Sequence, residues 1–250
     1  MANNLANIWD ADPDAAPKER ESFESDIVGR FRSGRLVKNG TRDEPESLNE
    51  WRVTTGDPTV AAKIAELFGG EVEPWETDKE DNLQILTDAK SVQIVIEPDG
   101  VDASFKQFIP GTGMVHHCDG FKYLSPDEDK GEVCRCPSLM AERKLRATQG
   151  RGPKPSVDVL FRLADAPDQG KFRFNSGSWK LVDALGPLFA DLDKHGNAES
   201  AVRASLTIKN VSYVPKKGPR AGQQISYNVP EIKILGPAED SGSVELDKAA

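Results

Sequence analysis

The chain has 250 residues, of which 37% are hydrophobic and 29% are charged, and its formal net charge is −9. This length is enough for one large domain, or two small ones, with a substantial core. No apolar run approaches the roughly 20 residues that a membrane-spanning helix needs, and the N-terminus lacks the basic-then-apolar order of a secretory signal. We therefore expect a soluble, cytoplasmic protein.

The charge is distributed unevenly along the chain. Residues 1–105 carry 11 Lys or Arg and 23 Asp or Glu, whereas residues 106–235 carry 20 and 14. A phosphate backbone would repel the acidic front half, while the basic half could contact either a phosphate backbone or an acidic protein surface. Residues 1–24 are rich in Asp, Glu, Ala and Pro and are predicted to form a disordered acidic tail. Residues 236–250 form a second acidic tail, which leaves a folded domain at 25–235.

In the front half, residues 27–36 predict a short strand and turns, and the β-branched residues 51–55 predict a strand. Asp57 and Pro58 are typical of a helix start, and Gly69-Gly70 is typical of its end. Apolar residues between them recur at helical spacing, so we predict a helix here. Further strands are predicted at 71–75, 83–87, 91–97 and 103–109.

All three cysteines and two of the three histidines lie close together in the middle of the chain. His116 and Cys118 are spaced i and i+2, as are Cys134 and Cys136, and such pairs point to one side of an extended chain. Two strand ends of this kind can place one nitrogen and three sulfurs around a point. This is the Cys3His composition of a closed structural zinc site.

The sequence allows alternatives both for the fourth ligand and for the role of the cluster. Strand geometry favours His116 as the fourth ligand, with His117 as the alternate. The cysteines could also be a reduced structural set, a catalytic zinc site, or part of a catalytic Cys–His pair. A catalytic zinc needs an open coordination position and a nearby acid or base, and no HExxH or HxE…PCxxC pattern is present.

The second half predicts strands at 157–163 and 171–176, and then an amphipathic helix at 179–192 that Gly186-Pro187 interrupts. Two long strands, 204–214 and 223–235, follow. The sequence therefore predicts an α+β fold: a largely antiparallel sheet with two main helices and a zinc-stapled loop insertion at about 114–155.

Positive charge is concentrated in two segments of this half. The segment after Cys136 is basic with a single acid, Glu142, and the loop between the last two strands has no acid. Each segment is either a solvated loop or a contact surface for an acidic or phosphate partner. The candidate partner-binding residues are Arg143, Lys144, Arg146, Lys216, Lys217 and Arg220.

Sequence motifs of common enzyme classes are absent. There is no GxxxxGK[ST] loop, no GxGxxG between a strand and a helix, and no GxSxG elbow. We therefore expect that the protein is not an enzyme. The metal is expected to stabilise a loop that has too little apolar content to fold alone.

The order GRFRSGR, WRVTTGDP, AAKIAELFGGEVEPW, CDG and CRCP resembles the recombination directionality factors of Streptomyces temperate phages, the partners of large serine integrases. The likeness runs from about residue 25 to 235, and LFGGEVEPW with the CDG…CxCP pair is its most specific part. The family pattern supports Cys118, Cys134 and Cys136 as metal ligands. Many relatives place a fourth Cys before the strand that here is VDVLFRL. This sequence has GRGPKP there, so His116 or His117 substitutes or the site is weakened or lost.

The resemblance implies a non-enzymatic control protein. Such a factor binds the phage serine integrase on att-site DNA, permits attL × attR excision and inhibits attP × attB integration. It is not expected to bind a specific DNA sequence alone, to contact a membrane or to use a small-molecule substrate.

A competing hypothesis is a zinc-containing single-stranded-DNA-binding phage replication protein, and a third is a zinc-dependent hydrolase. A single-strand binder needs aromatic side chains interleaved with positive charge in a groove. The basic half offers aromatic candidates, although packing in the core or in a hairpin would also explain them: Phe172, Phe174, Trp179, Tyr213 and Tyr227.

Overall fold

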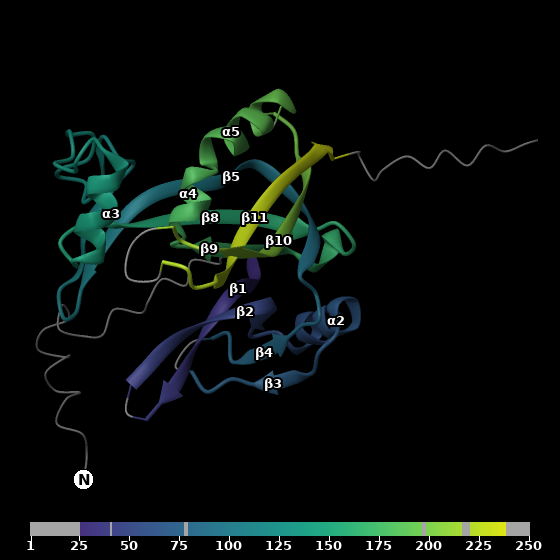
Figure 1. Cartoon of the computed structure of the whole chain (residues 1–250). Helices are drawn as coiled ribbons and strands as arrows, with labels where there is room; N and C mark the ends of the chain where they lie inside the picture. Colours follow the sequence, from purple (N-terminus) through teal and green to yellow (C-terminus); the bar gives the residue numbers. More distant parts are fainter. Residues whose placement is uncertain (1–25, 41, 78–79, 197–198, 217–220, 239–250) are drawn as a thin grey trace, which may run out of the picture.

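The structure, a computed structural model, describes residues 26–40, 42–77, 80–196, 199–216 and 221–238. The predicted N-terminal tail, Lys217, Arg220 and all but the first three residues of the predicted C-terminal tail lie outside this part. Most of the described chain is β-sheet, and helices pack at its edges and faces (Figure 1). This confirms the predicted α+β class.

Eleven strands form one sheet, in which nine follow the order β11-β10-β5-β8-β9-β1-β2-β4-β3, while β6 pairs with β5 and β7. Among the described strands β1 and β9 run parallel, and every other pair is antiparallel, as predicted. The strands are β1 (Ile27–Asn39), β2 (Arg42–Thr55), β3 (Val72–Pro74), β4 (Leu83–Leu86), β5 (Ser91–Ile109), β6 (Gly113–Cys118), β7 (Tyr123–Ser125), β8 (Lys154–Leu163), β9 (Lys171–Ser176), β10 (Val202–Tyr213) and β11 (Ile225–Pro237).

The sheet curls around a main hydrophobic core, and a smaller core lies beside the cysteines. At the far end of the sheet β11 reaches back to β2, where the Asn228 amide donates hydrogen bonds to the carbonyl of Leu48 and the side chain of Asn49. Inside lies an aromatic cluster in which Phe31 packs edge-to-face on Trp51, Phe161 and Phe172. Edge-to-face packing of this kind adds stability beyond the burial of apolar area.

The strand alternation that fills this core also builds the outer face of the sheet. Phe31 of β1 points inward, so Arg30 and Arg32 on either side point outward. Likewise Phe172 and Phe174 of β9 are fully buried, and Arg173 between them faces out. The outer face of β1 and β9 therefore carries these three arginines.

Four α-helices are described, where the sequence predicted two main ones. The predicted first helix is α2, in which the Asp57 carboxylate accepts a hydrogen bond from the amide of Thr59 at 2.7 Å. At its end a Cβ on Gly70 would collide with the carbonyl oxygen of Leu86. None of the described helices is long and apolar enough to cross a membrane. The helices are α2 (Pro58–Phe68), α3 (Met140–Thr148), α4 (Trp179–Asp183) and α5 (Leu185–Lys194), with a 3-10 turn η2 (Pro167–Gln169).

Three boundaries differ from the prediction. The second helix divides at Ala184, because Gly186-Pro187 falls in the first turn of α5, where proline's missing N–H is not needed. The predicted strands 91–97 and 103–109 are one bent strand, β5, whose register shifts between Ile96 and Val101. β1 is longer than expected, and the first half of its partner β2 was missed because its side chains are mostly exposed and polar.

The segment between β5 and β8 leaves the main strand order and forms a branch of the sheet, in which β6 pairs with β5 and β7. These two strands are direct antiparallel neighbours, yet about 44 residues separate Ile109 from Lys154. This excursion, residues 110–153, contains β6, β7 and α3 and projects beside the end of the sheet (Figure 1). It also holds all three cysteines.

Candidate metal centre

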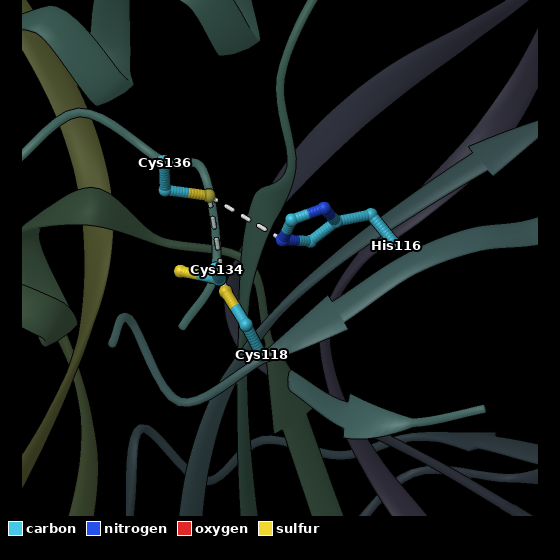
Figure 2. Close-up of side chains that lie close together, drawn as sticks. All are labelled: His116, Cys118, Cys134 and Cys136. Carbon is cyan, nitrogen blue, oxygen red and sulfur yellow. Dashed lines mark hydrogen bonds between the residues drawn. The ribbon is translucent and has the colours of Figure 1, made fainter. Parts of the chain in front are cut away.

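The four predicted ligands converge in the excursion (Figure 2). His116 and Cys118 lie on β6 and point to one side, as their i, i+2 spacing predicts. Cys134 and Cys136 lie on the extended segment after the isolated bridge between Lys122 and Val133. The four potential ligand atoms all lie within 4.8 Å of one another.

The distances within the cluster match the size of a tetrahedral site. Cys136 Sγ lies 3.9 Å from Cys118 Sγ and 3.3 Å from His116 Nε2. Zinc–sulfur bonds of about 2.3 Å and zinc–nitrogen bonds of about 2.0 Å place tetrahedral ligands about 3.5–3.8 Å apart. The three cysteines are free thiols, so the cluster is not held by a disulfide. The donor set and its spacing therefore fit a divalent metal ion with soft ligands.

A tight turn after Cys118 aligns the two halves of the cluster. The Asp119 carboxylate accepts hydrogen bonds from the amides of Phe121 and Lys122, both at 2.7 Å, and these bonds lower the pKa of Asp119. Gly120 has a φ of 106°, which side-chain-bearing residues rarely adopt. The amide of Cys134 then donates to the carbonyl of Phe121 at 2.7 Å, which fixes the second ligand pair against the first.

The cluster is shielded from water on most sides. Cys118 is fully buried and Cys134 is 7% exposed, and both pack with Phe105 of β5. Trp179 of α4 covers the same small core, with its ring 6.1 Å from that of Phe105. Burial of Cys118 and Cys134 is typical of a structural metal ion, whereas His116 and Cys136 are half-buried and border a hollow.

Burial sets the protonation of the ligands. It raises the pKa of the Cys118 thiol to about 12, and it also raises the pKa of Cys136. Burial lowers the pKa of His116, with smaller contributions from His117 and Arg143, so the imidazole is neutral at pH 7. The histidine is therefore ready to coordinate, whereas the thiols must lose protons to a metal ion.

This predicts a measurable release of protons. Zinc titrated into the metal-free protein at pH 7 should release about three protons per ion, one from each thiol. Calorimetry in buffers of different ionisation enthalpy measures this number. The apparent affinity should fall as the pH is lowered, because protons then compete for the sulfurs. Release of fewer than two protons would contradict a three-thiolate site.

His117, the alternate fourth ligand, lies outside the cluster. Its neighbour His116 faces the cysteines, so the strand alternation turns His117 to the other side of β6. There its Nδ1 lies 3.0 Å from the hydroxyl of Ser125 on β7. The structure thus places His116 rather than His117 beside the three sulfurs.

Comparison with known families adds an independent observation. Residues 28–234 match the Gp3-like family, whose description is recombination directionality factor-like. This chain belongs to that family. The match runs from β1 almost to the end of β11, so it covers nearly the whole described fold, including the residues of the cluster. No solved structure matches the chain.

In this directionality factor-like protein, Arg143 makes buried structural contacts that the sequence did not predict. Only 8% of its surface is exposed, and its Nη2 donates a hydrogen bond to the carbonyl of Gly120 at 2.5 Å. Its guanidinium also lies over the ring of Phe105, 5.3 Å from the centroid. Arg143 therefore ties α3 to the turn that positions Cys118.

The other predicted partner-binding residues are spread over the surface. Lys144 and Arg146 of α3 are exposed, as is Lys216 after β10, while Lys217 and Arg220 lie outside the described residues. Exposure of these side chains leaves them accessible to a partner but does not identify one.

The aromatic residues that the sequence offered for stacking nucleic-acid bases are mostly unavailable. Phe172 and Phe174 are completely buried in the core, so that part of the hypothesis is wrong. Trp179 packs beside the cysteines, and Tyr213 and Tyr227 pack edge-to-face on each other in the β10–β11 hairpin. Strand periodicity alone could not show that β9 faces inward at its phenylalanines.

Proposed function

We propose that this protein is a phage recombination directionality factor of the Streptomyces temperate-phage type. It binds a large serine integrase on att-site DNA, permits attL × attR excision and inhibits attP × attB integration. The observation that carries this proposal is the family match over residues 28–234, which spans nearly the whole described fold.

The proposed action is regulatory rather than catalytic. A binding protein redirects an enzyme by binding one of its arrangements more tightly than another. To shift the ratio of two integrase arrangements from 1:99 to 99:1, the factor must bind one of them roughly 5.5 kcal/mol more tightly than the other. A protein–protein contact with a few well-packed apolar anchors is sufficient for this.

The metal in this proposal is a structural zinc ion held by His116, Cys118, Cys134 and Cys136. The ion would supply no chemistry beyond cross-linking β6 to the segment after β7. Support comes from the soft donor set, the ligand spacing and the burial of Cys118 and Cys134. The free energy of binding at such a site contributes directly to folding.

The excursion carries the kind of surface that an integrase could recognise. Phe121 and Val133 are each 78% exposed, and the hydrogen bond from Cys134 to Phe121 holds them near each other beside the metal ligands. Exposed apolar side chains gathered on one segment are typical of protein contact sites. Further exposed apolar residues of the same segment are Met114, Val115, Leu139, Met140 and Leu145.

A recombination assay tests the proposal. Purified cognate integrase alone should recombine attP with attB and leave attL × attR unrecombined. Addition of this protein in excess should reverse that preference, raising excision by at least about tenfold and lowering integration, because it stabilises the excision-competent arrangement. Unchanged integration together with no excision would overturn the proposal.

Matched variants locate the contact. Phe121→Ser with Val133→Ser should reduce excision by at least about tenfold, the effect of losing roughly 1.4 kcal/mol of apolar contact. Leu36→Ser serves as the control, since Leu36 is 68% exposed but lies on β1, away from the excursion. Equal loss of excision in the control would argue against a docking surface on the excursion.

A further inference from the structure

Four hollows share lining residues in series. Three of them lie on the outer face of the sheet, whereas the first lies on the metal-cluster side of β5, to which Phe105 and Gln107 point. The first, beside His116 and Cys136, shares Gln107 and Gly152 with the second. The second and third share several residues of β5, β8 and β9, and the third and fourth share residues 32–34 of β1. We call this continuous feature the basic groove. It runs from the metal cluster past Gln107 and Gly152 to the outer face of the sheet, and from there across β8, β9 and β1 to Trp75.

The groove is strongly basic in a protein that is acidic overall. Twelve of its lining residues are Arg or Lys and three are Asp or Glu, whereas the chain carries a net charge of −9. Nine of the twelve are arginines, whose planar guanidinium matches the oxygens of a phosphate. Five of the cations come from the acidic front half, so strand pairing gathers charges that are scattered along the sequence.

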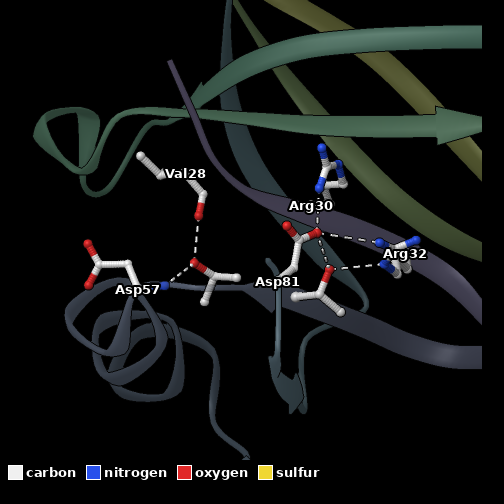
Figure 3. Close-up of polar contacts among 7 residues, drawn as sticks. Val28, Arg30, Arg32, Asp57 and Asp81 are labelled. Atoms are coloured by element: carbon white, nitrogen blue, oxygen red, sulfur yellow. Dashed lines mark hydrogen bonds and ion pairs between the residues drawn. The ribbon is translucent and has the colours of Figure 1, made fainter. Parts of the chain in front are cut away.

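Few acids compensate these cations within the groove. Arg30 and Arg32 share the single carboxylate of Asp81 (Figure 3). Arg173 and Lys106 share Asp158 in the same way. With Glu80, which also lines the third hollow, three carboxylates lie beside these four cations, and Glu46 pairs with Arg35 at the far end. The groove therefore keeps a net positive charge.

The first hollow has no described carboxylate partner for any of its arginines, which are Arg135, Arg143, Arg146 and Arg151. The Nη1 atom of Arg143 is buried and has no hydrogen-bond partner among the described residues. A buried guanidinium without a carboxylate partner carries an uncompensated charge, and an anion in this hollow would interact favourably with that charge.

At the opposite end, Arg52 is 4% exposed and its Nε donates to the Gln84 amide oxygen at 2.8 Å. Its guanidinium lies 4.3 Å from the centre of the Trp75 ring. Burial lowers the pKa of Arg52 to about 10, with further contributions from the positive charges of Arg32 and Arg35. An anion bound beside Arg52 would relieve this repulsion.

Aromatic side chains lie among these positively charged residues. Phe108 is 65% exposed and lines both the second and the third hollow, and Trp75 lines the fourth. The two largest hollows have volumes of about 750 and 790 Å³. Positive charge along a path, with an exposed ring such as Phe108 on which a base can stack, is the arrangement of grooves that hold single strands.

We propose that the basic groove binds single-stranded DNA, with its arginines on the phosphates and Phe108 stacked on a base. This role goes beyond the proposed control of an integrase, because it requires no integrase. It would let the protein hold an exposed strand near a recombining or replicating site without reading its sequence.

Fluorescence anisotropy of the zinc-loaded full chain with a labelled oligonucleotide of about 20 nucleotides tests the proposal. Binding should weaken by at least about tenfold between about 50 and 200 mM salt, because bound phosphates release counterions. The double variant Arg146→Gln, Arg151→Gln should make the negative slope of log K against log salt shallower by about 1.4. Each lost phosphate contact to a single strand accounts for about 0.7 of this change.

Two further variants separate the contributions. Phe108→Ala should weaken single-strand binding by about fivefold or more while leaving the salt slope unchanged, because it removes stacking but no charge. Arg203→Gln with Lys233→Gln is the matched control: both are exposed strand residues that line none of the four hollows. This pair should leave affinity and slope unchanged.

Three outcomes would overturn the inference. They are no binding at low salt, equal loss of affinity in the control pair, and tighter binding of duplex DNA or of a polyglutamate peptide than of the single strand. The measurement contains no integrase, so failure here leaves the recombination proposal standing. Loss of excision activity would likewise leave the groove assignment intact.

Discussion

Replacement of Cys118 by serine is expected to abolish tight zinc binding and to lower the free energy of unfolding by about 3 kcal/mol or more. Cys118 is fully buried at the base of the cluster, so water cannot take the place of the missing thiolate. The excursion exposes many of its large apolar side chains and buries few, so little else holds it together. Elemental analysis of zinc and denaturant unfolding measure the two effects.

The neighbouring histidines provide a matched control for this prediction. His116→Ala should lose zinc as Cys118→Ser does, whereas His117→Ala should retain about one zinc per chain, because His117 points away toward Ser125. A chelator should destabilise the wild-type protein and leave Cys118→Ser unchanged. Retention of zinc by His116→Ala and its loss from His117→Ala would show that the ligand assignment is wrong.

The sequence predicted the candidate site well because its geometry is local. The i, i+2 spacing of His116 with Cys118 fixes two ligands on one side of an extended strand, whatever the rest of the fold does. The start and end of α2 were equally predictable, since an Asp–Pro start and a Gly–Gly end act within one helical turn. Such features depend on a few neighbouring residues and survive any tertiary arrangement.

The basic groove could not be predicted, because it depends on which strands become neighbours. Arg30 of β1 meets Arg173 of β9 through a parallel pairing that joins residues far apart in the chain. The charge count of the front half even argued against a phosphate partner, since its acids outnumber its cations. Strand alternation places the arginines of the front half on one outer face. The electrostatic potential at this face is therefore positive, although the front half as a whole carries a net negative charge.

The buried position of Arg143 shows a further limit. In the sequence it is one cation in a basic segment, and solvent exposure is the usual state of such a residue. The fold buries it because α3 packs over the turn at Gly120 and the ring of Phe105. A contact of this kind arises only once the excursion has closed around the cysteines, so no local pattern marks it.

The second large effect is expected in the core. Phe31→Ala should lower the free energy of unfolding by about 3–5 kcal/mol, through lost burial and the cavity that remains. Phe31 is 1% exposed, and its ring lies 5.4 Å from Phe161 and 5.6 Å from Phe172, so several strands lose a shared contact. These neighbours belong to β8 and β9, two central strands of the sheet. Chemical denaturation with zinc present measures the change.

Phe121→Ala is the matched control for this change, because it removes the same atoms from a side chain that is 78% exposed. It should change the free energy of unfolding by less than about 0.5 kcal/mol. Both variants should keep about one zinc per chain, since neither side chain donates to the metal cluster. If Phe31→Ala cost no more than Phe121→Ala, then the sheet would not be organised around this ring. The outward direction of Arg30 and Arg32, and with it the basic groove, would then lose its structural basis.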